Sequence, residues 1–259
     1  MKSFDKSRLP RAVSDKITGS CVPEAIGRSG DDVLVFENSV LKISDSAGLC
    51  REHAAMSFLY GRLNVPQPLA FEKHEGKYYL LMSKMDGTMV CYLDGDNRTK
   101  ARLLGQAARQ VLQVCCNGLP DELCDAEQYD LDAAKRNIQQ GKVPSHGVGG
   151  FCSTCGLYEY LCSVKPAPQY FTHGDFCLPN ILYDGKSVGF IDLGGAGAGG
   201  KWRDIAMCIW SMRYNFEGQE LCGFALSDMR DYEREFFYTL QLEPDEQSIN
   251  YYLLLAQLF

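Results

Sequence analysis

Apolar residues in the first eighty-odd positions recur in short runs of three to five residues. These runs cover 33–36, 39–43, 69–71 and 78–82, and the turn His74-Glu75-Gly76 separates the last two. Short apolar runs bounded by turn residues are typical of strands. This part of the chain is therefore predicted to form a mostly antiparallel sheet.

One helix is predicted to interrupt these strands. Residues 47–63 carry an apolar stripe with the helical period, made of Leu49, Met56, Leu59 and Leu63. The following Asn64-Val65-Pro66 is a helix-ending sequence. The first part of the chain is thus an expected sheet with one helix against it.

Beyond Met85-Asp86-Gly87-Thr88, which breaks the pattern and is a candidate hinge, helical periodicity dominates. Helices are predicted over 99–116, 121–139, 157–164, 202–214, 219–239 and 248–258. Two short strands, 181–183 and 188–192, form a predicted hairpin between the third and fourth helices. Residues 141–150 form a polar, glycine-rich loop. The fold class indicated is α+β.

Composition narrows the function classes. The 259 residues are 46% hydrophobic and 23% charged, as in ordinary globular proteins, and the net charge is −7. Nucleic acid is not an expected partner, because its phosphates are bound by clustered Lys and Arg, whereas an acidic surface suits a cationic substrate. No run reaches the roughly 18 apolar residues of a membrane span. The charged N-terminus lacks the apolar core of a secretory signal.

The twelve cysteines are scattered along the chain, which predicts free thiols in a reducing cytoplasm. One group has metal-ligand spacing in part: His146, Cys152, Cys155 and Cys162. Its flanking spacings match no common zinc module, so ordinary thiols in a loop are the favoured interpretation over a zinc site.

A glycine-rich stretch has the spacing Gly195-x-Gly197-x-x-Gly200 and follows a predicted strand. That spacing is the fingerprint of a dinucleotide-binding turn. A dinucleotide fold would need further strand and helix units after the turn, but only about sixty residues follow, and they have helical patterns. The glycine fingerprint is therefore disfavoured as an explanation of function.

The residues around the predicted hairpin carry a more specific pattern. His173-Gly174-Asp175 is followed by Asn180 and then by Asp192 twelve positions later. A hairpin brings its ends together, and an amide oxygen with a carboxylate suits Mg²⁺. Asp175, before the hairpin, is free to accept a proton from a hydroxyl, which is the division of labour found in kinases. A hairpin with merely polar ends is the alternative.

Two charges in the first part of the chain support this hypothesis. Lys42 lies in an otherwise apolar strand, and Glu52 lies on the apolar face of the predicted helix. Burying either charge alone would be costly, so the two are predicted to pair. Snorkelling of each to the rim is the alternative. A kinase site uses such a strand lysine and helix glutamate around the nucleotide phosphates.

The loop Gly27-Arg28-Ser29-Gly30 precedes the first strand. Its glycines, Gly27 and Gly30, would let backbone N–H groups approach phosphates. A tight turn would use the same glycines. The chain has no Walker motif.

On these residues the chain resembles the aminoglycoside phosphotransferases of the protein-kinase-like fold, and among them the aminoglycoside 3'-phosphotransferases. The resemblance runs from about Cys21 to Phe259. It is carried by His173-Gly174-Asp175-x4-Asn180, Gly189-Phe190-Ile191-Asp192-Leu193-Gly194, Lys201-Trp202-x-Asp204-Ile205-Ala206, Leu80-Leu81-Met82-Ser83 and Asn64-Val65-Pro66-Gln67-Pro68, and by the ending at Tyr251 to Phe259.

The resemblance implies a bilobal fold with ATP and Mg²⁺ in the cleft. Asp175 would be the catalytic base, and Asn180 and Asp192 the magnesium ligands. Lys42 would contact the nucleotide phosphates and Glu52 would hold Lys42. The product would be an O-phosphorylated antibiotic, which confers resistance.

The resemblance also implies boundaries. Residues 1–85 would be the nucleotide-binding lobe, a small antiparallel sheet with one helix, and residues 86–259 the larger helical lobe that binds the acceptor. The hinge Ser83-Lys84-Met85 would meet the adenine through its backbone, with Ser83 and Met85 as contacts. Residues 194–200 would be a flexible loop after the metal aspartate. We expect a cytoplasmic enzyme that acts as a monomer or weak dimer.

The chain departs from the family where the substrate would bind. The family has acids before its terminal phenylalanine and in the loop before the HGD sequence, but here no acid follows Glu246 and none lies in 133–158. The carboxylate of Phe259 remains. Gly195 stands where the family commonly has an arginine, and Arg203 and Lys201 are candidates to replace that charge.

Three hypotheses follow. The first is an aminoglycoside 3'-phosphotransferase with a reduced or altered antibiotic range. The second is a kinase of the same fold that acts on a less cationic hydroxyl compound. The third is a nucleotide-binding module with little catalysis, against which the retained site residues argue.

Overall fold

The computed structural model describes residues 6, 9–19, 22–23, 32–146, 148–221 and 223–259. The predicted phosphate loop with Gly27 and Gly30 lies outside the described residues. In the part described, no helix is both long and apolar enough to cross a bilayer.

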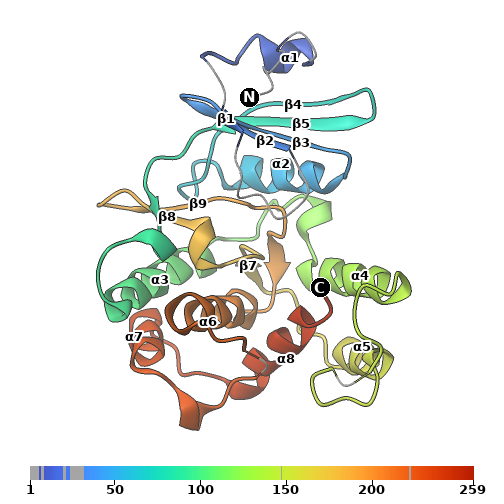
Figure 1. Cartoon of the computed structure of the whole chain (residues 1–259), viewed down its shortest axis with the longest axis vertical. Coiled ribbons are helices and arrows are strands. Elements are labelled where there is room, and N and C mark those ends of the chain that lie inside the picture. The colour runs from blue at the N-terminus through green and yellow to red at the C-terminus, as the bar shows by residue number, and fades with distance from the viewer. Residues whose placement is uncertain (1–5, 7–8, 20–21, 24–31, 147, 222) are drawn as a thin grey trace.

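The N-lobe is a five-stranded antiparallel sheet with helices above and below it (Figure 1). The strand order is β1 (Val22–Pro23), β2 (Asp32–Val35), β3 (Ser39–Ser44), β5 (Lys77–Ser83), β4 (Pro68–His74). The short helix α1 (Arg11–Ser14) lies on one face and α2 (Gly48–Leu59) on the other (Figure 1). The predicted sheet and its helix are confirmed, and α1 and β1 are additions.

Strand alternation divides the N-lobe core between these two faces. Leu41 and Leu81 point with Val13 into the cluster under α1, whereas Leu80 belongs to the core that continues through α2 into the C-lobe. Lys42 pairs with Leu80 in the ladder, so its side chain is directed to the α2 face. The alternation of side chains along β3 therefore directs the charged side chain of Lys42 to the α2 face of an otherwise apolar strand.

Helix α2 ends four residues before the predicted end at residue 63. Tyr60 leaves the helical conformation (ψ 122°), and Gly61 follows with φ 82°. A positive φ favours glycine, so this turn stops the helix although the apolar period continues to Leu63. The boundary prediction was wrong because periodicity does not report turn conformations.

The C-lobe contains two small sheets and most of the helices. One sheet has the order β6 (Thr88–Met89), β8 (Ile181–Tyr183), β9 (Val188–Phe190), and the other pairs β7 (Tyr170–Thr172) with β10 (Gly197–Gly199). The α-helices are α3 (Asn97–Leu112), α4 (Ala126–Gln139), α5 (Thr154–Ser163), α6 (Trp202–Glu217), α7 (Asp231–Leu240) and α8 (Glu246–Ala256). Single 3-10 turns are η2 (Val90–Tyr92), η3 (Asp121–Leu123), η4 (Leu178–Asn180) and η5 (Leu226–Asp228).

Side-chain caps move two predicted helix starts. Asp125 accepts a hydrogen bond from the backbone N–H of Gln128, so α4 begins at Ala126 instead of at residue 121. Ser153 caps α5 in the same way, and that helix begins at Thr154 instead of at residue 157. Caps satisfy backbone N–H groups that would otherwise lack partners, so they fix the first turn.

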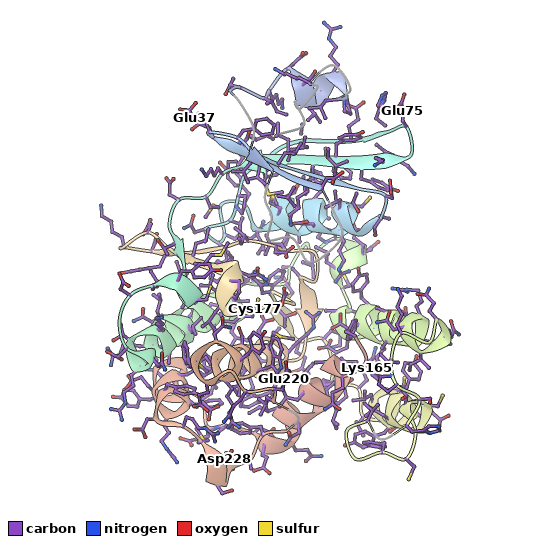
Figure 2. The ribbon with its side chains drawn as sticks, viewed as in Figure 1. Glu37, Glu75, Lys165, Cys177, Glu220 and Asp228 are labelled. Atoms are coloured by element: carbon purple, nitrogen blue, oxygen red, sulfur yellow. The ribbon has the colours of Figure 1, made fainter. Side chains whose placement is uncertain are left out.

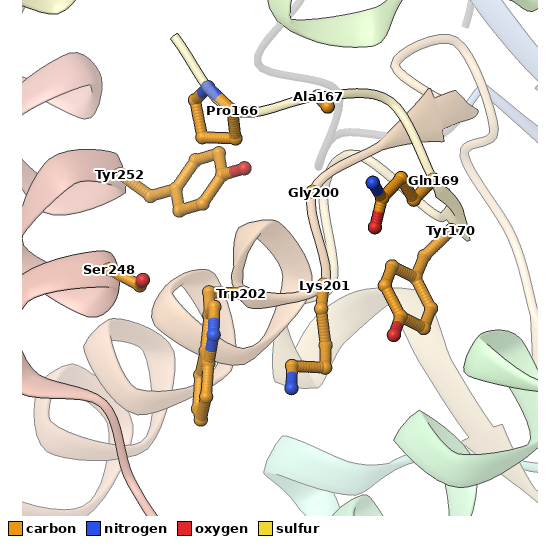
Figure 3. A pocket seen from close by; sticks show the side chains of 9 residues that line it. All are labelled: Pro166, Ala167, Gln169, Tyr170, Gly200, Lys201, Trp202, Ser248 and Tyr252. Atoms are coloured by element: carbon orange, nitrogen blue, oxygen red, sulfur yellow. The ribbon is translucent and has the colours of Figure 1, made fainter. Parts of the chain in front are cut away.

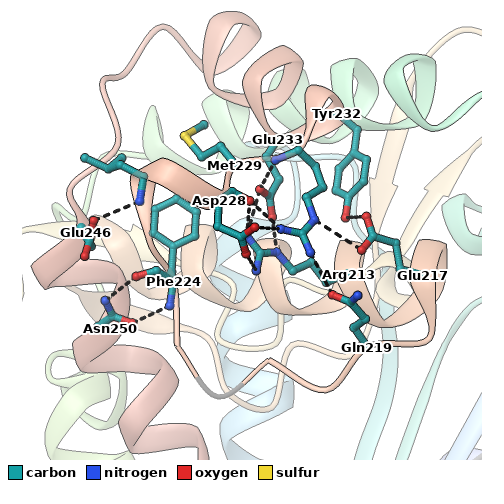
Figure 4. A network of polar contacts seen from close by, with 12 residues as sticks. Arg213, Glu217, Gln219, Phe224, Asp228, Met229, Tyr232, Glu233, Glu246 and Asn250 are labelled. Atoms are coloured by element: carbon teal, nitrogen blue, oxygen red, sulfur yellow. Dashed lines mark hydrogen bonds and ion pairs between the residues drawn. The ribbon is translucent and has the colours of Figure 1, made fainter.

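The predicted helix 219–239 is wrong in its first half. Gly218 ends α6 in the left-handed conformation (φ 67°), and α7 begins only at Asp231. Side chains of neighbouring helices satisfy the backbone between them: Asn250 donates to the Phe224 carbonyl at 2.8 Å and accepts from the Phe224 N–H at 2.7 Å (Figure 4). Hydrogen bonds from outside the segment thus replace helical ones.

A buried ion pair holds α6 to α7 beside this segment (Figure 4). Arg213 donates from Nε and Nη2 to the two oxygens of Glu233, at 2.6 and 3.1 Å. Both side chains are buried, and Glu233 also accepts from the backbone N–H of Arg230. This bidentate pair is a structural element of the C-lobe.

The glycine-rich run after Asp192 is not the flexible loop that was expected. Gly197–Gly199 form β10, which is buried and antiparallel to β7. A Cβ at Gly197 would lie 2.6 Å from the carbonyl oxygen of Leu123, and one at Gly199 would lie 2.9 Å from the carboxylate of Glu127. The glycines are therefore there because other elements press closely on this strand.

We predict that Gly105→Ala lowers the free energy of unfolding. Its Cβ would lie 2.8 Å from the carbonyl oxygen of Phe236 and 2.9 Å from the Cβ of Thr239, where α3 packs on α7. Overpacking of about 1–3 kcal/mol exceeds the roughly 1 kcal/mol that alanine gains over glycine in a helix. Denaturant unfolding measures the difference. The control Gln106→Ala, on the exposed face of α3, should stay within about 0.5 kcal/mol, and a rise in stability for Gly105→Ala would contradict the packing argument.

Candidate active site

A sharp turn carries Asp175 between β7 and η4. Gly174 has φ 86°, and a Cβ there would collide with the carbonyl of Gly195, so the turn needs glycine. The buried carboxylate of Asp204 accepts from the backbone N–H groups of His173 at 2.6 Å and Gly174 at 2.9 Å. Helix α6 thus fixes the turn from below, and the adjoining Cys177 lies in the middle of the molecule (Figure 2).

Asp175 and Asn180 are in direct contact. The side-chain amide of Asn180 donates to Oδ2 of Asp175 at 2.7 Å and to its backbone carbonyl at 3.0 Å. These bonds orient the Asp175 carboxylate and leave Oδ1 of the Asn180 amide outside them. The five-residue spacing is met by the single turn of η4.

The hairpin brings Asn180 next to the segment of Asp192, as predicted. β8 and β9 pair directly, and the N–H of Ile191 donates to the carbonyl of Asn180 at 3.1 Å. Asp192 has the uncommon φ of 62°, and its side chain is 52% exposed. An accessible carboxylate beside an amide oxygen is a donor set that fits Mg²⁺.

Lys42 joins this cluster from the N-lobe. Its ammonium lies 2.6 Å from Oε1 of Glu52 and 3.0 Å from Oδ1 of Asp192. Burial alone would lower the pKa of Lys42, but the two carboxylates outweigh burial and raise that pKa above its usual value. The predicted Lys42–Glu52 pair is therefore formed, and it extends to Asp192 from the hairpin.

The hinge follows β5. Ser83 exchanges hydrogen bonds with Gln67, and the backbone N–H of Lys84 donates to the carbonyl of Asn38 at 3.0 Å. Met85 extends over the hairpin, because a Cβ at Gly189 would lie 2.6 Å from Cε of Met85. The hinge thus borders the same hairpin that supplies Asn180 and Asp192.

The C-terminal segment packs against the α4–α5 loop. Asn137 donates to the carbonyl of Leu258 at 3.0 Å, and Leu254 fills the space that a Cβ at Gly149 would occupy. Phe259 is exposed. Leu254 and Leu258, which precede the predicted substrate residue, thus contact the glycine-rich loop and α4.

The carboxylates of α4 already have partners. Asp125 pairs with Lys165, Asp130 with Arg203, and Asp132 accepts from Gln128. Glu127 is fully buried and accepts from the Gly200 N–H at 2.6 Å and the Tyr252 hydroxyl at 2.8 Å. Of the acids of α4, Asp132 is exposed with a neutral amide as its partner, whereas Glu127 and Asp130 are held within the C-lobe.

Neither candidate for the missing positive charge lies at the site. Arg203 is buried, pairs with Asp130 at 2.7 Å and donates to the carbonyl of Gly195 at 3.0 Å. Lys201 lies over the ring of Trp202. The guanidinium of Arg203 therefore supports the turn from behind, and Lys201 faces another part of the C-lobe.

Lys201 and Trp202 line a pocket of about 280 Å³ between the start of α6, the N-terminal half of α8 and the segment before β7 (Figure 3). Of the residues considered for the site from the sequence, Lys201 lines it. Its lining residues are Pro166, Ala167, Gln169, Tyr170, Gly200, Lys201, Trp202, Ser248 and Tyr252.

The zinc interpretation is not supported. Among the described residues no group of three or more His, Cys, Asp or Glu side chains is placed to hold a metal. His146, Cys152, Cys155 and Cys162 are all exposed. Ordinary thiols, the favoured interpretation, fit this arrangement.

Three residues of the site region were not assigned a function from the sequence. Asp204 appeared only inside a matched motif, although it holds the turn that carries Asp175. Ser211 accepts from the backbone N–H of Leu178 at 3.0 Å, and Arg51 donates to the backbone of Ala196. Each of the three side chains binds backbone groups that are distant in sequence, so no local spacing of residues indicates its function. The one signal available in the sequence was the charge of Arg51, which lies next to Glu52 in a helix predicted to pack on the sheet.

The two lobes, the lysine–glutamate pair and the loop aspartate define the protein-kinase-like class of fold. The model of the phosphotransferase enzyme family matches residues 26–238. An aminoglycoside 3'-phosphotransferase of Enterococcus faecalis is 32% identical over 92% of this chain and 93% of its own length. The chain belongs to the phosphotransferase enzyme family, and it is an enzyme that transfers phosphoryl groups to hydroxyls.

Solved structures agree on the fold. An aminoglycoside-3'-phosphotransferase of type VIII superposes with a TM-score of 0.72 at 20% identity, covering 96% of this chain and 97% of that chain. An aminoglycoside phosphotransferase of Streptomyces rimosus, in complex with ADP and streptomycin, gives a TM-score of 0.67 at 20% identity, covering 95% and 94%. The predicted fold class and family are confirmed.

We predict that Asp204→Asn lowers kcat by about tenfold or more, because the turn loses a charged double acceptor and small misplacement of a catalytic group is costly. The KM for nucleotide should change little, since the hydrogen bonds of the Asp204 carboxylate go to the backbone of the turn. Steady-state kinetics measure both. Asp228→Asn, at an exposed C-lobe carboxylate, is the control. Wild-type kcat in a folded Asp204→Asn protein would remove this positioning function.

Proposed function

We propose that the protein transfers the γ-phosphate of ATP to a hydroxyl of an aminoglycoside, with Mg²⁺ as cofactor. The observation that carries this proposal is the convergence of Lys42, Glu52 and Asp192 on one ion cluster, next to the Asp175–Asn180 pair. Three separate elements supply these charges. An ion cluster open to solvent at Asp192 is suited to phosphates and a divalent cation.

Each side chain has one task in the proposed mechanism. Asp175 orients the acceptor hydroxyl and accepts its proton during in-line attack on the γ-phosphorus. Asn180 holds Oδ2 of that carboxylate and so fixes its orientation. Lys42 offsets phosphate charge, and Glu52 fixes its direction. Asn180 and Asp192 would hold Mg²⁺, which supplies positive charge that offsets the charge on the phosphates.

The nucleotide is proposed to lie between residues 1–85 and residues 86–259. Because the N–H groups of Ser83 and Lys84 are used within the N-lobe and by its loop, the backbone N–H of Met85 is the hinge donor proposed for adenine. Gly27 and Gly30 are proposed to approach the phosphates. We further propose a monomer or weak dimer acting in the cytoplasm.

The aminoglycoside is preferred to another hydroxyl compound because relatives named aminoglycoside 3'-phosphotransferases match along nearly their whole length. Asp175 and the terminal carboxylate of Phe259 are the carboxylates proposed to face a cationic acceptor. Because the α4 acids Glu127 and Asp130 are held by partners within the C-lobe, we expect weak binding of the most highly charged aminoglycosides.

The testing experiment is ADP release from Mg-ATP by the purified protein with kanamycin, neomycin, amikacin and unrelated alcohols. Turnover that depends on an aminoglycoside supports the proposal. Nucleotide binding with turnover of other alcohols alone would replace the acceptor and keep the phosphotransferase. Absence of nucleotide binding would refute both.

We predict that Asp175→Ala lowers kcat by about two to four orders of magnitude, the usual contribution of a general base, and leaves ATP affinity nearly unchanged. ADP release and calorimetric nucleotide titration measure the two quantities. The exposed Asp184→Ala, at the β8–β9 turn, is the matched control. If Asp175→Ala retained wild-type kcat, the base would have to be another group.

We predict that Asp192→Ala abolishes the part of nucleotide affinity that depends on Mg²⁺, because a ligand of the cation and a partner of Lys42 are lost together. Titration of ATP with Mg²⁺ and with a chelator gives the two affinities. Wild type should bind more tightly with Mg²⁺, whereas the two values should coincide in the variant. A preserved Mg²⁺ effect would exclude Asp192 as a ligand.

A further inference from the structure

The buried guanidinium of Arg51 is not used by the mechanism above. We propose that Arg51 is a positioning residue: it fixes helix α2 to the segment after Asp192 and so holds the Lys42–Glu52 pair in register with the proposed metal site. This inference rests on the proposed function, since the register matters only if these residues handle a nucleotide.

Arg51 extends from the N-lobe helix into the C-lobe. Its Nη2 donates to the carbonyl of Ala196 at 2.8 Å, and its Nη1 donates to the carbonyl of Glu122. The guanidinium lies over the ring of Tyr129 on α4, with Cζ 4.2 Å from the ring centroid. Only 6% of the residue is exposed. One side chain therefore joins α2 to η3, to α4 and to the glycine-rich segment.

The contacts close a ring through the chain. Asp192 pairs with Lys42, and Lys42 pairs with Glu52. Arg51 directly precedes Glu52 in α2 and binds Ala196, four positions after Asp192. The segment from Asp192 to Ala196 is thus held at one end by Glu52 through Lys42 and at the other end directly by Arg51. A shift of α2 relative to that segment would have to break both links.

The chemistry of the site suits arginine and not lysine. The guanidinium spans two carbonyl oxygens from different elements and stacks on an aromatic ring, which a single ammonium does not do. Burial lowers the pKa of Arg51, and neither oxygen that accepts from it carries a formal charge. A buried cation that is held by uncharged carbonyl groups costs folding free energy. We therefore infer that this position requires the directed geometry of the guanidinium. Its direct effect here is to define the position of α2.

The glycine-rich segment is shaped to admit this guanidinium. A Cβ at Gly197 would lie 2.8 Å from Nη2 of Arg51 and 2.6 Å from the carbonyl oxygen of Leu123. Gly197→Ala would therefore displace Arg51 without changing any charge. This gives a second route to the same perturbation from the opposite side of the contact.

The test is a double-mutant cycle on nucleotide kinetics. The variants are Arg51→Met, Glu52→Gln and the pair together, with Arg51→Lys and Gly197→Ala as milder versions. Arg213→Met is the matched control, because Arg213 is equally buried and has charged partners far from the lobe contact. All are assayed well below their melting temperatures for kcat, KM for ATP and Mg-ATP affinity by calorimetry.

We expect Arg51→Met to lower kcat/KM for ATP by about 10- to 100-fold, as expected for displaced catalytic groups. The double variant should be no more than about twofold worse than the more impaired single variant, because Arg51 acts through Glu52. Arg51→Lys and Gly197→Ala should fall between wild type and Arg51→Met. Arg213→Met should lower the melting temperature and leave KM for ATP unchanged.

Three outcomes would overturn the inference: wild-type nucleotide kinetics in folded Arg51→Met, effects of Arg51→Met and Glu52→Gln that multiply, or an equal loss in Arg213→Met. If Arg51→Met does not fold, Arg51→Lys and Gly197→Ala decide, with the Gly105→Ala clash as control. If the wild type phosphorylates no aminoglycoside, the proposed acceptor fails separately, because Mg-ATP affinity still ranks the Arg51 variants.

Discussion

A partly buried ammonium group is the constraint on which the rest of the structure depends. Lys42 points from an apolar strand into the contact between sheet and helix, where an unpaired charge would be strongly destabilising. Glu52 and Asp192 both approach it within 3.0 Å, so α2 and the β8–β9 hairpin have to meet at one point. Electrostatics at a single atom thus sets the relative position of three elements that are distant in sequence.

The second half of the site is organised by backbone contacts rather than by charge pairs. The turn before Asp175 and the segment after Asp192 approach so closely that glycine is needed at Gly174. Asp204 and Arg203, successive residues at the start of α6, support these segments from below, one by accepting from backbone N–H groups and the other by donating to a backbone carbonyl. The side chains proposed for catalysis are thereby held by a scaffold whose own side chains hydrogen-bond to the main chain.

The sequence predicted the sheet, the hairpin and the Lys42–Glu52 pair, because period two, period 3.6 and misplaced charges are local signals. It did not predict where α7 begins, because Asn250 and Glu246, which bind the segment before α7, belong to the next helix. It missed β7 and β10 for a related reason: short strands that pair across 25 or more residues have no periodicity of their own. The contacts of Arg51 could not be predicted from the sequence, because their acceptors are backbone carbonyl groups, which every residue carries.

The strand Gly197–Gly199 and the adjoining Gly200 are touched by side chains from α2, α4 and α8: Arg51, Glu127 and Tyr252. At each of these glycines, a side chain from another helix fills space that a larger residue would need. Substitutions in this tract therefore depend on substitutions elsewhere. A residue larger than glycine would be tolerated only if the side chain that contacts it became smaller. Among descendants of such a chain, substitutions here should appear as linked pairs with residues of α2, α4 or α8, and a tract that looks like low-complexity sequence would evolve among the slowest in the protein.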